Sequence, residues 1–135
     1  MARTVLVVDD VPFVRKILSQ ILSDAGYQVV GEAGDGLEAC HQFRRLKPDL
    51  VTMDIVMPRM SGIEATRQII KDTPEAIVVI VSAMGQENLV TEAIQVGAKD
   101  YILKPFTANE MVKTLDRLLT GKEPVSKGMR QEAKF

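Results

Sequence analysis

The chain has 135 residues, of which 46% are hydrophobic and 26% are charged, and its formal net charge is −1. This length predicts one domain with a real core, and the near-neutral charge gives no electrostatic case for nucleic-acid binding. No apolar stretch approaches the roughly 20 residues that span a bilayer, and the first residues do not form a signal peptide. The single cysteine, Cys40, excludes an internal disulfide. These features predict a cytoplasmic protein that does not enter a membrane.

The first strand and the first helix are predicted close to the start of the chain. An apolar run rich in β-branched residues predicts a strand near 4–9. A helix is expected at about 12–25, because Pro12 suits its first turn and Gly26 suits its end. One apolar face of this helix is formed by Phe13, Ile17, Ile21 and Leu22.

The rest of the chain repeats the alternation of strand and helix. The later elements are expected at 28–33, 35–47, 49–54, 61–73, 76–82, 86–96, 100–103 and 107–121, strand first and then helix in each pair. Capping boxes, in which Asp, Ser or Thr precedes Glu by three residues, mark helix starts at Asp35, Ser61 and Thr107. Five such units with right-handed crossovers predict a doubly wound α/β fold, with a five-stranded parallel sheet covered by helices on both faces.

The end of the sequence reads differently from the rest. Residues 122–135 contain four basic and two acidic residues, with little apolar periodicity. We therefore expect one domain over 1–121, followed by a flexible tail at 122–135 with no further domain.

Three acidic side chains stand at the ends of two predicted strands. Asp9 and Asp10 follow the first strand, and Asp54 follows the third. The carboxyl ends of parallel strands meet at one edge of the sheet, where ligands bind. Three carboxylates that meet there repel one another unless a cation lies among them. Taken alone, the pair Asp9 and Asp10 is as compatible with a helix N-cap and a surface acid as with a functional site.

Two further strands end in groups of the opposite kind, the hydroxyl of Ser82 and the ammonium of Lys104. A carboxylate can attack phosphorus, and phosphoryl transfer needs mainly positioning and neutralisation of charge. Acids, a hydroxyl and a lysine therefore predict a site for a phosphoryl group and a divalent metal. Mg²⁺ is the expected ion, because the offered ligands are hard oxygens.

At these residues the sequence resembles the receiver domains of two-component response regulators, from residue 3 to about 120. Four segments carry the resemblance, namely VLVVDD at 5–10, DLVTMDIVMPRMSGIE at 49–64, VSAMG at 81–85 and AKDYILKPF at 98–106. It implies a flavodoxin-like (βα)₅ fold with strand order 2-1-3-4-5. It also implies that Asp54 is the phosphoacceptor and that Lys104 binds the phosphoryl group. The implied protein ligands of Mg²⁺ are Asp9, Asp10, Asp54 and the backbone carbonyl of Val56.

The resemblance also implies a conformational switch. Ser82 moves toward the phosphoryl group, Tyr101 follows it inward, and the surface formed by 86–96, 100–103 and 107–121 repacks. The Lys104-Pro105 bond matches a peptide that is cis in this family.

Within the family, the sequence is most similar to single-domain chemotaxis regulators of the CheY type. This implies a histidine kinase as the donor and the flagellar motor switch as the target. We expect a monomer, with a dimer as the alternative. Val56 and Met84 depart from the better-known members, since neither side chain can orient a hydrolytic water by hydrogen bonding. We therefore predict slow self-dephosphorylation and a role for a separate phosphatase.

Three alternatives remain at this point. One is a non-chemotactic phosphorelay receiver, and another is a receiver cut from a transcriptional regulator. The third is a phosphatase of the haloacid dehalogenase type, which usually needs a second aspartate where this chain has Val56. We therefore expect no turnover of an external substrate and do not expect an enzyme in that sense.

Overall fold

The computed structural model describes residues 2–120, so the predicted tail at 122–135 lies outside the described residues. The strands are β1 (Thr4–Val8), β2 (Gln28–Ala33), β3 (Leu50–Met53), β4 (Val78–Ala83) and β5 (Asp100–Lys104). The helices are α1 (Pro12–Asp24), α2 (Gly36–Leu46), α3 (Gly62–Asp72), α4 (Glu87–Gln95) and α5 (Ala108–Thr120). Within the described range, each helix is too short or too polar to cross a membrane.

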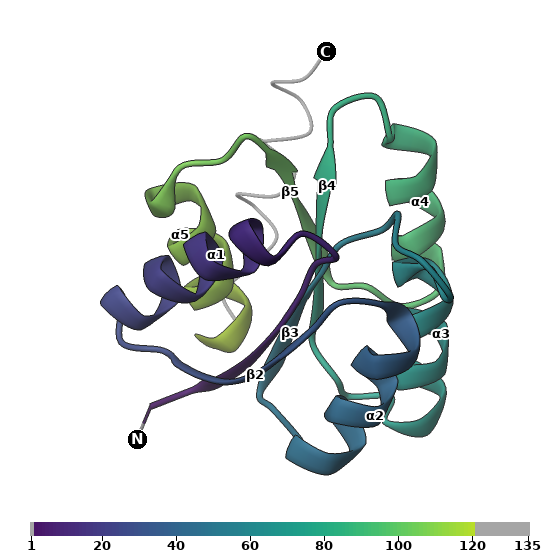
Figure 1. Ribbon diagram of the computed structural model, residues 1–135, viewed down its shortest axis with the longest axis horizontal. Helices are drawn as coiled ribbons and strands as arrows, with labels where there is room; N and C mark the ends of the chain where they lie inside the picture. The colour runs from purple at the N-terminus through teal and green to yellow at the C-terminus, as the bar shows by residue number, and fades with distance from the viewer. Residues whose placement is uncertain (1, 121–135) are drawn as a thin grey trace.

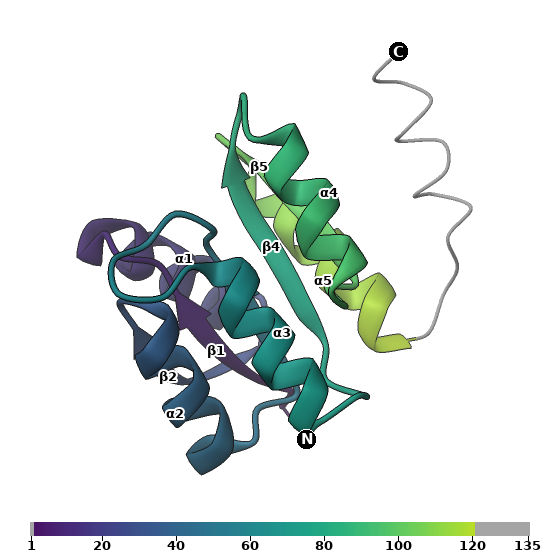
Figure 2. The ribbon, with the colours of Figure 1, turned by 90° about the vertical axis from the view of Figure 1, so that its right-hand side faces the viewer.

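The five strands form one parallel sheet in the order β2-β1-β3-β4-β5. Helices α1 and α5 cover one face of the sheet, and α2, α3 and α4 cover the other, as Figure 1 shows. Turning the molecule brings the second group to the front, with α3 across the middle of the sheet (Figure 2). The predicted doubly wound α/β fold and its flavodoxin-like strand order are confirmed.

Alternation along the strands divides the core into two layers. Val5 and Val7 of β1 point into a cluster with α1 and α5, whereas Leu6 and Val8 point into a cluster with α2, α3 and α4. Because successive side chains of a strand point to opposite faces, a strand buried on both sides is largely apolar on both. This explains why β1 is apolar from Val5 to Val8 and why β3 is apolar except for the buried Thr52, both runs stopping where the site begins.

The predicted capping boxes start three of the helices. The side chain of Asp35 accepts a hydrogen bond from the N–H three residues on at 2.8 Å, and that of Ser61 does the same at 3.1 Å. Thr107 and Glu110 close the full reciprocal box, each side chain accepting from the other's backbone N–H. These bonds satisfy N–H groups that a helix start leaves without partners.

The predicted apolar face of α1 is partly wrong. Leu18 and Leu22 are buried against the sheet, while the side chains of Phe13 and Ile17 are 69% and 41% exposed. Apolar residues cover more than one side of this helix, so periodicity alone did not decide which side meets the sheet. The consequence is an exposed apolar strip on α1.

Tyr27, which directly precedes β2, is bonded to α5 on the face of the sheet that α1 and α5 cover. Its ring is buried beside α1, and its hydroxyl donates a hydrogen bond to the carboxylate of Asp116 on α5. Burial, together with this hydrogen bond and the Asp116 charge, raises the pKa of the Tyr27 hydroxyl above its ordinary value of 10.0. The folded state therefore prefers the neutral phenol.

We expect Tyr27→Phe to lower the free energy of unfolding by about 1 kcal/mol at pH 8, the typical net value of one hydrogen bond. A pKa raised by folding gives stability that is complete below pH 10.0 and is lost as the pH rises further. The parent should therefore lose stability more steeply than the variant above pH 10. Urea unfolding at pH 8 and at several alkaline pH values measures both effects, and equal alkaline slopes would contradict the assignment.

Candidate functional site

The carboxyl edge of the sheet brings the three predicted acids together. Asp9 and Asp10 leave β1 and Asp54 leaves the neighbouring β3, and each offers a carboxylate oxygen within 4.8 Å of the others. Asp9 and Asp54 are buried, whereas Asp10 is exposed at the mouth of the site. The predicted meeting of these carboxylates is confirmed.

Lys104 reaches the same place from the end of β5. Its Nζ lies 2.9 Å from Oδ2 of Asp9 and 3.7 Å from Oδ2 of Asp54. The ammonium is only partly exposed, so it offsets some of the repulsion among the acids. The following peptide, Lys104-Pro105, is cis, as the resemblance implied.

Asp54 is held through its backbone and its side chain. Its N–H donates to the carbonyl of Val8 at 3.0 Å, and its Oδ1 accepts from the N–H of Ile55 at 2.8 Å. Burial raises the pKa of the Asp54 carboxyl to about 6, because the charged form is poorly solvated. The ammonium of Lys104 opposes this shift, and the charges of Asp9 and Asp10 add to it. The charged form of Asp54 is thus destabilised in the folded protein, and a nearby cation would stabilise it.

Ser82 lies near the end of β4, the strand between those that lead to Asp54 and Lys104. Its hydroxyl is fully buried and has no hydrogen-bond partner among residues 2–120. A buried hydroxyl without a partner is uncommon, because it loses its bonds to water without replacement. Such a group is ready to donate to an oxygen that arrives at the site.

The set of donors fits Mg²⁺. The cluster offers oxygen ligands alone, as hard divalent cations prefer, and its net negative charge is only partly balanced by Lys104. The hydroxyl of Ser82 also remains without a hydrogen-bond partner in the described part of the chain, so it is a donor left over for an oxygen-rich group. Which atoms bind the ion, including the carbonyl of Val56, remains a prediction.

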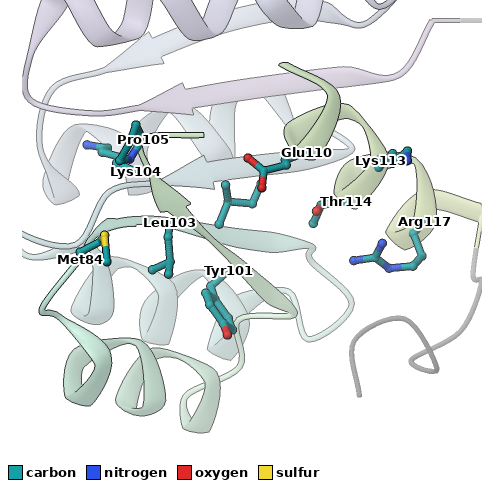
Figure 3. A pocket seen from close by; sticks show the side chains of 10 residues that line it. Met84, Tyr101, Leu103, Lys104, Pro105, Glu110, Lys113, Thr114 and Arg117 are labelled. Carbon is teal, nitrogen blue, oxygen red and sulfur yellow. The ribbon is translucent and has the colours of Figure 1, made fainter. Parts of the chain in front are cut away.

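Tyr101 lines a groove beside the acidic site. It is partly buried and packs against the cluster under α2, α3 and α4. The groove has a volume of about 540 Å³ and runs between β5 and α5, with Met84 and Lys104 at one end (Figure 3). Lys104 thus belongs to the groove and to the acidic site at once, so that it connects the two. The switch role of Tyr101 stays a prediction.

Val56 and Met84 stand at the rim. Their side chains are 58% and 69% exposed. Each lies two residues beyond a residue of the site, Val56 after Asp54 and Met84 after Ser82. Their positions are compatible with the predicted influence on hydrolysis.

The sequence reasoning missed two residues that support the site. Arg15 on α1 donates from Nη1 to the backbone carbonyl of Asp9. Gly62 packs so closely on β3 that an added Cβ would lie 1.8 Å from the carbonyl oxygen of Asp54. A glycine directly after a helix cap was a signal for the second contact, but nothing in the sequence pointed to the first.

Fold and site together define a flavodoxin-like α/β domain with an acidic pocket, a lysine and a free hydroxyl at one edge of its sheet. The family model of the response regulator receiver domain matches residues 5–116. The chain therefore belongs to the family of response regulator receiver domains.

Known relatives resemble the chain over most of its length. It is 49% identical over 118 residues to chemotaxis protein CheY of Thermotoga maritima, covering 87% of this chain and 98% of that protein. It is 47% identical to protein CcdB of Bacillus subtilis, covering 85% and 96%. A chain of the CheX–CheY–BeF₃–Mg²⁺ complex from Borrelia burgdorferi has a TM-score of 0.83 at 34% identity, covering 87% of this chain and 89% of that chain.

Proposed function

We propose that the protein is a phosphoacceptor that receives a phosphoryl group on Asp54 from a histidine kinase and signals by a change of shape. The observation that carries the proposal is the meeting of three carboxylates, a lysine and an unpartnered buried hydroxyl at one edge of the sheet. The protein would act in the cytoplasm as a monomer, without turnover of an external substrate.

Each residue of the site has its own role in phosphoryl transfer. An oxygen of the Asp54 carboxylate bonds to phosphorus as the bond from phosphorus to the donor's histidine nitrogen breaks. The ammonium of Lys104 and the hydroxyl of Ser82 bind the oxygens of the transferred group. Asp9, Asp10, Asp54 and the carbonyl of Val56 would hold Mg²⁺, which supplies positive charge against these oxygens.

The same contacts explain how the signal leaves the site. Lys104 is paired with Asp9 before transfer, and a phosphoryl group offers it a stronger partner. Ser82 gains a partner for a hydroxyl that has none. Lys104 lines the groove at the end of β5, and Ser82 of β4 pairs with Leu103, which lines it too, so movement of both residues would reshape the surface of α4, β5 and α5.

We further propose that the process is chemotaxis, with the flagellar motor switch as the target. The similarity to CheY proteins over nearly their whole length supports this proposal. We therefore favour a chemotaxis regulator over the receiver of a transcriptional regulator, because the matched CheY proteins are covered to 98% and 99% of their length. If the proposal holds, the phosphorylated chain binds the motor switch protein of its own organism more tightly than Asp54→Asn does, as calorimetry would show. Equal affinities would point to another phosphorelay.

The chemistry is tested by mass spectrometry after incubation with acetyl phosphate and MgCl₂. The parent should gain one phosphoryl group, and the gain should disappear with EDTA and in Asp54→Asn. Asp49→Asn is the matched control, because Asp49 lies at the opposite end of β3 from Asp54. A folded parent that binds Mg²⁺ but gains no phosphoryl group would contradict the mechanism, and sustained hydrolysis of a generic phosphoester would indicate a phosphatase instead.

The lifetime of the phosphoryl group should depend on Val56. We expect Val56→Asn to speed loss of the phosphoryl group about five- to tenfold, because one added hydrogen bond to the attacking water is worth about 1–1.4 kcal/mol. Decay of the phosphorylated protein, followed by mass spectrometry after removal of the donor, gives the rate. Val56→Ala is the control, since it opens the rim without offering a hydrogen bond. If alanine accelerates the decay as much as asparagine, Val56 acts as a steric gate instead.

A further inference from the structure

Arg15 is the one cationic side chain of α1 that the structure ties to the acidic turn. Its Nη1 donates to the backbone carbonyl of Asp9 at 2.5 Å, and its Nε pairs with Oε1 of Glu32 on β2 at 2.9 Å. The arginine side chain is only 19% exposed, although it starts from a surface helix. An added Cβ at Gly34 would lie 3.4 Å from Nη1, so the guanidinium also lies against the backbone of the β2–α2 loop.

This contact acts on the peptide that joins the two acids. The carbonyl of Asp9 and the N–H of Asp10 belong to one planar unit, so holding the carbonyl sets the orientation of the whole plane. The plane in turn fixes the position of the Asp10 Cα, so that only the rotations at Asp10 itself remain to set the direction of its side chain. Asp9 itself is fixed by other bonds, since its N–H donates to Ala33 at 3.0 Å and its Oδ1 accepts from the N–H of Val11 at 2.9 Å.

We propose that Arg15, oriented by Glu32, is a positioning residue for the cation site, because it holds the Asp9–Asp10 peptide in the orientation that aims Asp10 at the ion. The proposal rests on the Mg²⁺ site of the proposed function and extends it to residues outside the acidic cluster. Groups behind metal ligands commonly affect affinity tenfold or more, because they decide how much reorganisation binding requires.

The electrostatic effect and the positioning effect of Arg15 predict opposite changes in the affinity for Mg²⁺ when this residue is replaced. A guanidinium close to the turn repels an incoming cation, so removing its charge should by itself tighten the binding of Mg²⁺. Losing the anchor of the peptide should weaken it. The direction of the change in Kd therefore separates the two effects.

The test is a titration of the full chain with MgCl₂ after treatment with EDTA, followed by the NMR shifts of backbone amides. Arg15→Met should raise the Kd for Mg²⁺ about tenfold. Arg15→Lys keeps the charge but cannot bond to Asp9 and Glu32 as a fork, so its Kd should lie between those of the parent and Arg15→Met. Lys16→Met is the matched control, because Lys16 is the next residue of α1, carries the same charge and is exposed. It should leave the Kd unchanged or slightly lower.

The free energy of unfolding in EDTA is measured beside each titration. A merely structural role would lower this free energy in Arg15→Met and leave the Kd as it is in the parent, which would overturn the proposal. A lower Kd in Arg15→Met would overturn it as well and assign the residue a repulsive role. A parent that binds no Mg²⁺ would instead refute the proposed function itself, so the two failures are distinguishable.

Discussion

Asp54→Asn is expected to stabilise the metal-free protein at pH 7 by about 1–2 kcal/mol. Burial beside Asp9 raises the pKa of Asp54 to about 6. At pH 7 the folded protein therefore contains a carboxylate whose charge is less well solvated than it would be in water. A shift of this size corresponds to about 3 kcal/mol, reduced here because solvent reaches the mouth of the site. The amide keeps the shape of the side chain without its charge.

The pH dependence should separate the two proteins. The pKa of Asp54 is raised by folding from 3.8 to about 6, so the parent gains stability as the pH falls from 7 toward 4 from this group. Asp54→Asn should lack this gain. Urea unfolding in EDTA between pH 4 and 8 measures it for both.

Mg²⁺ should reverse the order of stability. A ligand present at 100 times its Kd stabilises the folded state by about 2.7 kcal/mol, and the parent should receive more of this than a variant with one carboxylate fewer. Asp24→Asn is the control, because Asp24 is exposed at the end of α1 and should change stability by only a few tenths of a kcal/mol. A less stable Asp54→Asn in EDTA would show that the carboxylates are not in conflict.

The parts of this molecule that the sequence predicts best are those set by short-range signals. The capping residues Asp35, Ser61 and Thr107 form bonds three residues away, so both partners are visible in the sequence. The ends of β1 and β3 are equally clear, because a largely apolar run buried on two faces stops at an aspartate. Strand ends then locate the site, since a parallel sheet brings Asp9, Asp54 and Lys104 to one edge.

Contacts between distant segments were not predictable in the same way. The side of α1 that meets the sheet depends on how the whole helix packs, and Phe13 was therefore assigned to the wrong side. The bond from Arg15 to Asp9 joins a side chain to a backbone carbonyl, which any residue possesses, so no residue pattern marks it. The residues that hold the site in place are thus harder to predict from the sequence than the residues of the site itself.

Gly62→Ala should disturb the site as strongly as the loss of a catalytic side chain. The new Cβ would lie 1.8 Å from the carbonyl oxygen of Asp54 and 3.0 Å from Cγ of Met53, far inside van der Waals contact. The first turn of α3 is also fixed, because the N–H of Gly62 donates to the carbonyl of Ile55 at 2.8 Å. The methyl group can be accommodated only if α3 or the residues around Asp54 move.

We expect Gly62→Ala to cost about 3 kcal/mol or more of unfolding free energy, the upper range for overpacking. The measurement is urea unfolding in EDTA, with Mg²⁺ affinity determined on whatever fraction stays folded. Gly26→Ala is the control, because Gly26 has a φ of 94° but nothing within 4 Å of an added Cβ. It should cost only about 1–2 kcal/mol, the strain of a left-handed residue, and leave the affinity for Mg²⁺ unchanged. If the two variants lose equal stability and both keep that affinity, the close approach of α3 does not hold Asp54 in place.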